Sequence, residues 1–229
     1  MDAHRIDGLA AVIPAAGASR RMGRCKALLD LRGSPLLARC AGLLRAGGVS
    51  EIVVVTPSGN AELSKSTDDG PARQLDGPVH DLARKLGLRT VAAPADGDMF
   101  ASIRAGLSAL GPGSRAVFIL PVDMPLVRPL TIMALAAALQ PETPAVVPVH
   151  AGQRGHPPLL SARAVGQVLA WEGGGGLRAA LSGLPGLATL EVDDPGVLLD
   201  LDTPEDLALA LRSESHAPQL TIAAMRSQE

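Results

Sequence analysis

The sequence predicts an α/β fold in which helices flank both faces of an open, mainly parallel sheet. Short apolar runs that read as buried strands alternate along the chain with segments of helical spacing, the pattern of repeated strand–helix–strand crossovers. Hydrophobic residues make up 47% of the 229 residues, yet Trp, Tyr and Phe together number only three. The core must therefore be built from Ala, Val, Leu and Ile, as is typical of a parallel sheet buried on both faces.

The predicted strands are runs of apolar and β-branched residues. In chain order they are Leu9–Ile13, Glu51–Thr56, Leu88–Ala93, Ala116–Pro121 and Ala145–Val149. Pro148 interrupts the last run. Because proline donates no backbone hydrogen bond, we expect this strand at an edge of the sheet.

The predicted helices have apolar residues at three- and four-residue spacing. They are Leu36–Ala46, Phe100–Leu110 and Leu130–Leu139. Ser34 and Pro35 supply a cap and a first helical residue for the first of these, and two glycines end it. A further helix follows Thr203, which is its expected cap, with Pro204 at the first position and acids in the first turn.

We expect a single domain over residues 1–229, with a flexible polar loop at 57–78 and a polar tail at 213–229. The net charge of −2 gives no general attraction to nucleic acid or to an anionic membrane. The first residues lack the order of a signal peptide, and no apolar run reaches the about 18 residues of a membrane span. Two cysteines predict neither a disulfide framework nor a metal cluster. A cytoplasmic protein is the expectation.

The loop after the first strand, Pro14–Lys26, places small residues first and four cations afterwards: Arg20, Arg21, Arg24 and Lys26. Small residues let backbone N–H groups approach an anion, and guanidinium and ammonium groups neutralise phosphate charge. The same composition also occurs in ordinary surface loops. The spacing matches neither the dinucleotide fingerprint nor the Walker loop, which disfavours those two nucleotide classes.

Acidic residues follow two of the predicted elements. Asp123 lies just beyond a buried strand, where open α/β sheets bind ligands, and several residues before the helix that it could otherwise cap. Asp200 and Asp202 stand two residues apart, which in an extended segment puts both carboxylates on one face. Such a pair can share a divalent cation, although two solvated turn residues would look the same.

Taken together, five segments resemble the nucleotidyltransferases of the molybdopterin-dinucleotide synthesis group, most closely those that use CTP. They occur in the family's order and are Pro14–Lys26, Gly33–Leu37, Pro121–Leu126, Arg154–Pro157 and Leu199–Leu207. The resemblance implies a Rossmann-like nucleotidyltransferase domain. The segment Glu172–Leu177 departs from the acidic, glycine-containing segment usual in the family, and this departure concerns the acceptor.

The resemblance also implies roles for individual residues. The nucleotide would be bound by Ala15, Ala16, Gly17, Ser19, Arg20, Arg21, Met22, Gly23, Lys26 and Ser102. The catalytic residues would be Lys26, Arg21 and Asp123. Asp123, with Asp200 or Asp202, would hold Mg²⁺, while Arg154, Gly155 and His156 would contact the acceptor.

The implied reaction transfers CMP from CTP to the phosphate of molybdopterin and releases pyrophosphate, with a molybdoenzyme as a possible recipient of the product. Ala15-Ala16-Gly17, in place of the Ala-Gly-Gly or Gly-Gly of the guanylyl branch, favours CTP over GTP. Cytidylyltransferases of isoprenoid synthesis share this start. Two alternatives stay open: transfer to another small phosphate, such as a sugar, polyol or lactate phosphate, and a non-catalytic cofactor-handling protein of the same fold.

Overall fold

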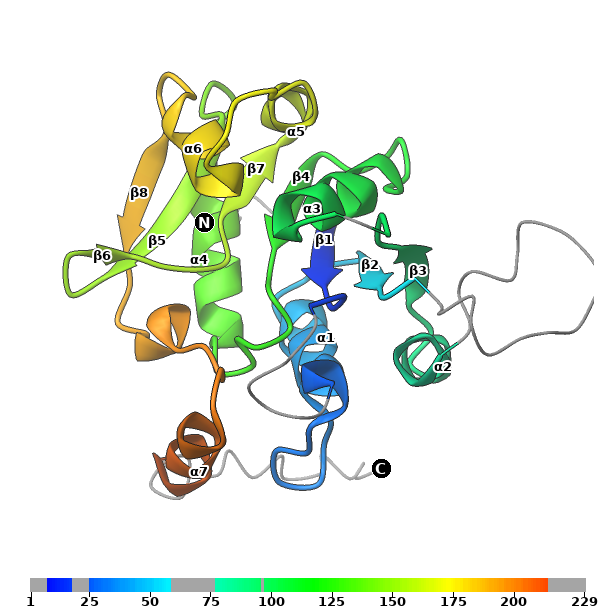
Figure 1. The fold of residues 1–229 in the computed structure, drawn as a ribbon. Helices are drawn as coiled ribbons and strands as arrows, with labels where there is room; N and C mark the ends of the chain where they lie inside the picture. The colour runs from blue at the N-terminus through cyan, green and yellow to red at the C-terminus, as the bar shows by residue number, and fades with distance from the viewer. Residues whose placement is uncertain (1–7, 18–24, 59–76, 96, 214–229) are drawn as a thin grey trace, which may run out of the picture.

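A computed structural model describes residues 8–17, 25–58, 77–95 and 97–213 (Figure 1). The strands are β1 (Leu9–Pro14), β2 (Glu51–Thr56), β3 (Arg89–Ala92), β4 (Ala116–Ile119), β5 (Ala145–His150), β6 (Gln153–Arg154), β7 (Leu159–Ser161) and β8 (Ala188–Glu191). The α-helices are α1 (Leu36–Ala46), α2 (Pro78–Lys85), α3 (Met99–Ser108), α4 (Pro129–Ala138), α5 (Ala162–Leu169), α6 (Gly176–Ser182) and α7 (Pro204–Ser213). Two short 3₁₀ helices, η1 (Lys26–Leu28) and η3 (Pro195–Leu198), also contribute to the candidate site.

The described strands form one eight-stranded sheet in the order β3-β2-β1-β4-β7-β5-β6, with β8 paired to β5. Strands β3, β2, β1 and β4 run parallel, whereas β7 runs antiparallel to both β4 and β5. The chain passes from β1 to β2 on one side and later returns to β4 on the other side of β1. Ligands of open α/β sheets bind at such a reversal, beyond the carboxyl ends of the strands.

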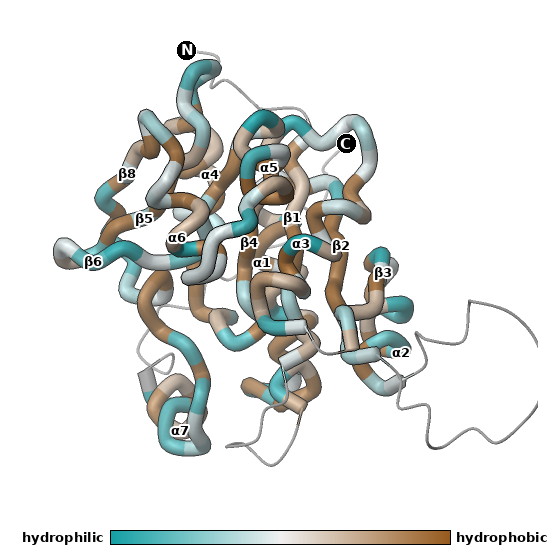
Figure 2. The backbone as a smooth tube through the Cα atoms, turned by 45° about the horizontal axis from the view of Figure 1, so that its top comes forward, coloured by the Kyte–Doolittle hydropathy of each residue, from teal (hydrophilic) through white to brown (hydrophobic). Residues whose placement is uncertain are grey.

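Alternation along β1 divides the core into two clusters. Leu9, Ala11 and Ile13 pack with α1, α2 and α4, whereas Ala10 and Val12 pack with α3, α5 and α6. Figure 2 shows the resulting apolar centre along β1, β2 and β4, with hydrophilic residues along β6. The predicted fold, a mainly parallel sheet with helices on both faces, is therefore confirmed.

The prediction that the strand at residues 145–149 lies at an edge is wrong, because β5 has neighbours on both sides. It pairs with β8 on one side and, on the other, first with β7 and then with β6. Pro148 lies between the residues of β5 that pair with β7 and those that pair with β6. No described strand accepts a hydrogen bond at this position, so the N–H that proline lacks is not required. The Pro148 carbonyl accepts the backbone N–H of Gly155 at 2.8 Å.

Several element ends differ slightly from the prediction. Helix α1 spans the predicted residues, but Pro35 rather than Ser34 occupies the cap position, and no side chain caps the helix. Helix α2 begins at Pro78, inside the predicted loop 57–78, of which residues 59–76 lie outside the described residues. The predicted tail lies outside them from residue 214 onward. None of the described helices combines the length and the hydropathy that a bilayer crossing requires.

Candidate active site

The candidate site lies at the carboxyl ends of β1 and β4. Ala15, Ala16 and Gly17 directly follow β1, and the backbone N–H of Ala15 donates to the Val55 carbonyl of β2 at 2.9 Å. Exposure increases along these three residues, from the buried Ala15 to the exposed Gly17. Asp123 follows β4 at the same edge of the sheet. The topology therefore brings the predicted nucleotide loop and the predicted metal ligand together.

Lys26, on η1, is the residue that joins the acidic segments. Its Nζ donates to Asp123 Oδ2 at 2.8 Å and also to Asp202 Oδ1. The Lys26 and Asp123 side chains are 15% and 19% exposed, whereas that of Asp202 is 38% exposed. Three segments that are distant in sequence thus meet around one largely sheltered ammonium group.

The electrostatics of Lys26 keep it charged. Burial by itself lowers the pKa of the ammonium group, but the hydrogen bonds and charges of Asp123 and Asp202 more than offset this, so the pKa is raised above its ordinary value. A lysine in this setting remains a cation at neutral pH, as phosphate binding requires.

Backbone contacts hold the two acidic segments against each other. Leu201 immediately precedes Asp202, and its backbone N–H donates to the backbone carbonyl of Asp123 at 2.8 Å. Thr203 and Asp206 form a reciprocal cap at the start of α7: Asp206 Oδ2 accepts the Thr203 N–H at 2.8 Å, and Thr203 Oγ1 accepts the Asp206 N–H at 3.2 Å. The predicted helix start at Thr203 and Pro204 is confirmed. The cap holds Thr203, the residue next to Asp202, in place.

The structure gives Asp200 and Asp202 different neighbours. Asp202 contacts Lys26, whereas Asp200 lines a cleft of about 400 Å³ that Asp123 and His156 also line. Met99 and Gln153 line the same cleft, and the sequence analysis named neither of them. Met99 opens α3 and Gln153 opens the two-residue strand β6; neither carries a local sequence signal of such a position.

Arg154, Gly155 and His156, the predicted acceptor residues, also line this cleft. The His156 N–H donates to the Val197 carbonyl of η3 at 2.8 Å. Burial lowers the pKa of His156, and the nearby charges of Asp123 and Asp200 only partly counteract this. His156 is therefore neutral at neutral pH.

Two glycines let three backbone segments of the site pack tightly. A Cβ at Gly155 would collide with the Val197 carbonyl oxygen, and a Cβ at Gly196 would collide with the Leu126 carbonyl oxygen. The buried Asp194 reinforces the second contact: its carboxylate accepts the Arg128 N–H at 2.8 Å and the Gly196 N–H at 3.0 Å. The loop after β4, η3 and the segment after β6 thus form one stack.

The remaining predicted residues do not all reach this site. Ser102, on α3, is 5% exposed, and its Oγ donates to the Asp98 carbonyl at 3.3 Å rather than lining the cleft. Its nucleotide contact stays a prediction. Residues Ser19, Arg20, Arg21, Met22 and Gly23 lie outside the described residues.

The topology and the site geometry define a nucleotidyltransferase-like α/β protein, and comparison with known proteins places it more closely. Residues 11–191 match the family model of the MobA-like NTP transferase domain. The chain belongs to this family. The nucleotidyltransferase class that the sequence predicted is confirmed at this level.

Relatives add detail about what the chain is similar to. The 2-C-methyl-D-erythritol 4-phosphate cytidylyltransferase of Streptomyces avermitilis is 34% identical over 143 residues, which cover 61% of this chain and 52% of that protein. The chain thus spans about half the length of the curated relatives that it matches.

Two solved structures show the same fold. Rv0371c from Mycobacterium tuberculosis has a TM-score of 0.69 at 23% identity, covering 89% of this chain and 97% of its own, and it has also been solved in complex with manganese. Molybdopterin-guanine dinucleotide biosynthesis protein A from Archaeoglobus fulgidus has a TM-score of 0.56 at 19% identity, covering 91% of this chain and all of its own.

Proposed function

We propose that this chain transfers the CMP group of CTP to the phosphate of a small acceptor and releases pyrophosphate. The observation that carries the proposal is the Lys26 ammonium group between Asp123 and Asp202, at the edge of the sheet where the loop after β1 ends. A sheltered cation beside carboxylates suits a reaction that brings several phosphate charges together.

The proposed reaction is an in-line displacement at phosphorus. A phosphate oxygen of the acceptor attacks the α-phosphorus of CTP, the new O–P bond forms, and the bond between the α-phosphorus and the bridging oxygen breaks to release pyrophosphate. The attacking oxygen is already anionic, so no general base is required. Alignment and charge neutralisation are the protein's part, with Lys26 and, by resemblance, Arg21 on the triphosphate.

The donor set of the cleft fits a hard divalent cation. Asp123 and Asp200 both line it, and Mg²⁺ is held in proteins by one or two carboxylates together with substrate phosphates and water. Among the residues that the structure describes, no group of three or more His, Cys, Asp or Glu side chains could hold a metal by itself. We therefore propose Asp123 and Asp200 as ligands shared with the substrate. The bound ion would neutralise charge on the reacting phosphates.

The proposed nucleotide and the proposed acceptor are supported by different observations. CTP is supported by Ala15-Ala16-Gly17 and by the cytidylyltransferase relatives. Molybdopterin as acceptor, and a molybdoenzyme as recipient of the product, are supported by the Arg154–Pro157 motif. The names of the curated relatives favour a second candidate, a sugar or polyol phosphate.

The experiment that tests this proposal is a screen for pyrophosphate release, with CTP or GTP against molybdopterin, 2-C-methyl-D-erythritol 4-phosphate and simpler phosphates. We expect release with CTP and one acceptor class. Replacing Asp123→Asn should lower the rate by about 100-fold or more. The control Asp81→Asn, which changes an exposed acid on α2, should keep both the rate and the melting temperature.

Two results would overturn the proposal. One is a wild-type protein that binds CTP but releases no pyrophosphate with any acceptor, which would favour the non-catalytic reading. The other is a folded Asp123→Asn variant with the full rate, which would remove Asp123 from the chemistry.

A further inference from the structure

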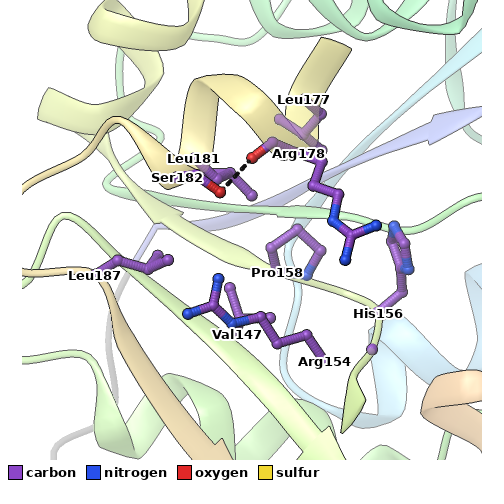
Figure 3. Close-up of a pocket in the computed structure, with 10 residues that line it drawn as sticks. Val147, Arg154, His156, Pro158, Leu177, Arg178, Leu181, Ser182 and Leu187 are labelled. Atoms are coloured by element: carbon purple, nitrogen blue, oxygen red, sulfur yellow. Dashed lines mark hydrogen bonds between the residues drawn. The ribbon is translucent and has the colours of Figure 1, made fainter. Parts of the chain in front are cut away.

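A second pocket shares the segment from Arg154 to His156 with the cleft. It has a volume of about 240 Å³ and lies between the strands β5–β7 and helix α6 (Figure 3). Arg154, Gly155 and His156 line both this pocket and the cleft that Asp123 lines, so the two spaces adjoin along this segment. A ligand that spans this segment could occupy both spaces.

Two guanidinium groups face the second pocket. Arg154 comes from β6 and Arg178 from α6, and in the view of Figure 3 their guanidinium groups lie on either side of Pro158. Asp and Glu are absent from the described residues that line this pocket. Arg154 and Arg178 are both exposed side chains at the pocket, and their guanidinium groups could bind an anionic ligand there.

Apart from His156 and Ser182, the other side chains that line the pocket are apolar. They include Val147 from β5, Pro158, and the leucines Leu181 and Leu187. The volume is below the about 300–1,000 Å³ of pockets that hold drug-sized ligands, so the pocket suits a compact group. The site thus combines apolar walls with two planar cationic side chains, whose geometry matches a carboxylate or a phosphate. Because the proposed function places the acceptor's phosphate in the cleft of Asp123, a carboxylate is the group left for this pocket.

We propose, resting on the proposed function, that this pocket binds a carboxylate of the acceptor while the acceptor's phosphate reacts in the adjoining cleft. This inference favours compact phosphorylated carboxylic acids, such as the lactate phosphate left open above, over molybdopterin and the polyol phosphates, which carry no carboxylate. Arg178 is the residue that determines this specificity, because it lines the carboxylate pocket without lining the cleft of Asp123.

The test uses two probes that differ in one group. Glycerol 3-phosphate carries a hydroxymethyl group where 3-phosphoglycerate carries a carboxylate, and both are titrated into the full chain by calorimetry in the presence of Mg²⁺. We expect 3-phosphoglycerate to bind at least about 10-fold more tightly, as for a hydrogen bond between charged groups. Arg178→Met should abolish that preference and leave the affinities for CTP and for glycerol 3-phosphate unchanged.

The experiment has a matched control variant, Arg163→Met, and a second readout, the fluorescence of Trp171. Arg163→Met removes a guanidinium from α5, outside the lining of both spaces, and should keep the preference. Trp171 is the only tryptophan in a chain without tyrosine, and it packs in the same cluster as Leu177 and Leu181. Its fluorescence should therefore change with 3-phosphoglycerate in the wild type and in Arg163→Met.

Equal affinity of the wild type for the two probes would overturn the inference. An equal loss of affinity for both probes in Arg178→Met would also overturn it, since Arg178 would then bind the phosphate that the two probes share. Failure of the proposed function looks different: a protein that prefers 3-phosphoglycerate but releases no pyrophosphate from CTP with any acceptor would keep the carboxylate pocket and lose the reaction.

Discussion

At the scale of single residues, Lys26 has the clearest physical role. Sequence reasoning could place it in a phosphate-binding loop and could identify Asp123 as an acid beyond a buried strand. It could not identify Asp202 as the second partner of Lys26, because that contact spans 176 residues and depends on how α7 is docked. A spacing of two residues predicts that Asp200 and Asp202 lie on one face of the segment, but it does not predict which residues each carboxylate contacts.

Replacing Lys26→Met should lower the rate of pyrophosphate release by about 100-fold or more, because the triphosphate loses a charge contact while Asp123 and Asp202 lose their common cation. Single-turnover kinetics with saturating CTP would measure this loss. The control Lys85→Met changes an exposed lysine at the end of α2 and should leave the rate unchanged.

The same substitution has a pH signature. Because the pKa of Lys26 is raised in the folded chain, its contribution to stability is complete below the ordinary value of 10.5 and is lost as the pH rises through the folded value. The difference in unfolding free energy between wild type and Lys26→Met should therefore stay constant from pH 7 to 9. A difference that shrinks over that range would contradict the raised pKa.

At the scale of elements, the strands with a clear apolar or β-branched run were predictable, including the four-residue β3 and β4, whereas the two shortest strands were not. Strands β1, β2 and β4 are buried runs whose composition alone identifies them. Strands β6 and β7 contain two and three residues, too few for a period to be read, and they are held by pairing with β4 and β5. Their existence depends on tertiary contacts, which the local sequence does not report.

Glu51 links three elements at the start of β2, and its loss should be measurable. Its carboxylate accepts hydrogen bonds from Ser114 Oγ at 2.8 Å and from the Gly111 N–H at 3.1 Å, and it pairs with Arg89 of β3. Glu51→Gln should cost about 1–2 kcal/mol of unfolding free energy in urea titrations at pH 7. The control Glu142→Gln, at an exposed turn, should cost little.

The pH dependence of this effect has a definite sign. Burial alone would raise the pKa of Glu51, but the bonds from Ser114, Gly111 and Arg89 outweigh it and lower the pKa. The contribution of Glu51 is therefore present above its ordinary value of 4.5 and is lost as the pH falls through the folded value. The cost of Glu51→Gln should shrink below pH 4.5, and a cost that grows there would contradict this account.

At the scale of the whole molecule, the stack of three backbone segments joins the two halves of the site. Gly196→Ala would drive a Cβ into the Leu126 carbonyl, and the buried backbone around Asp194 leaves little room for relaxation. We expect a loss of about 1–3 kcal/mol in unfolding free energy. Calorimetric melting would measure it.

Gly166→Ala is the matched control, since this glycine lies inside α5 and a Cβ there would meet no atom within 4 Å. It should stabilise the chain by up to about 1 kcal/mol through helix propensity. A Gly196→Ala variant as stable as Gly166→Ala would show that the stack tolerates separation.

The reversal of strand direction at β7 has an evolutionary consequence. Because β7 runs against β4, the chain enters β7 at the edge where β1 and β4 end, and the Pro158 carbonyl there accepts the Ile119 N–H at 3.1 Å. The segment of residues 150–158, between β5 and β7, thus reaches the candidate site without passing through the parallel strands, one of which precedes the proposed nucleotide loop. If this segment binds the acceptor as proposed, its sequence could change in evolution without a change in the strands that precede the proposed nucleotide loop. Exchanging residues 150–158 between relatives would be the corresponding way to engineer acceptor choice.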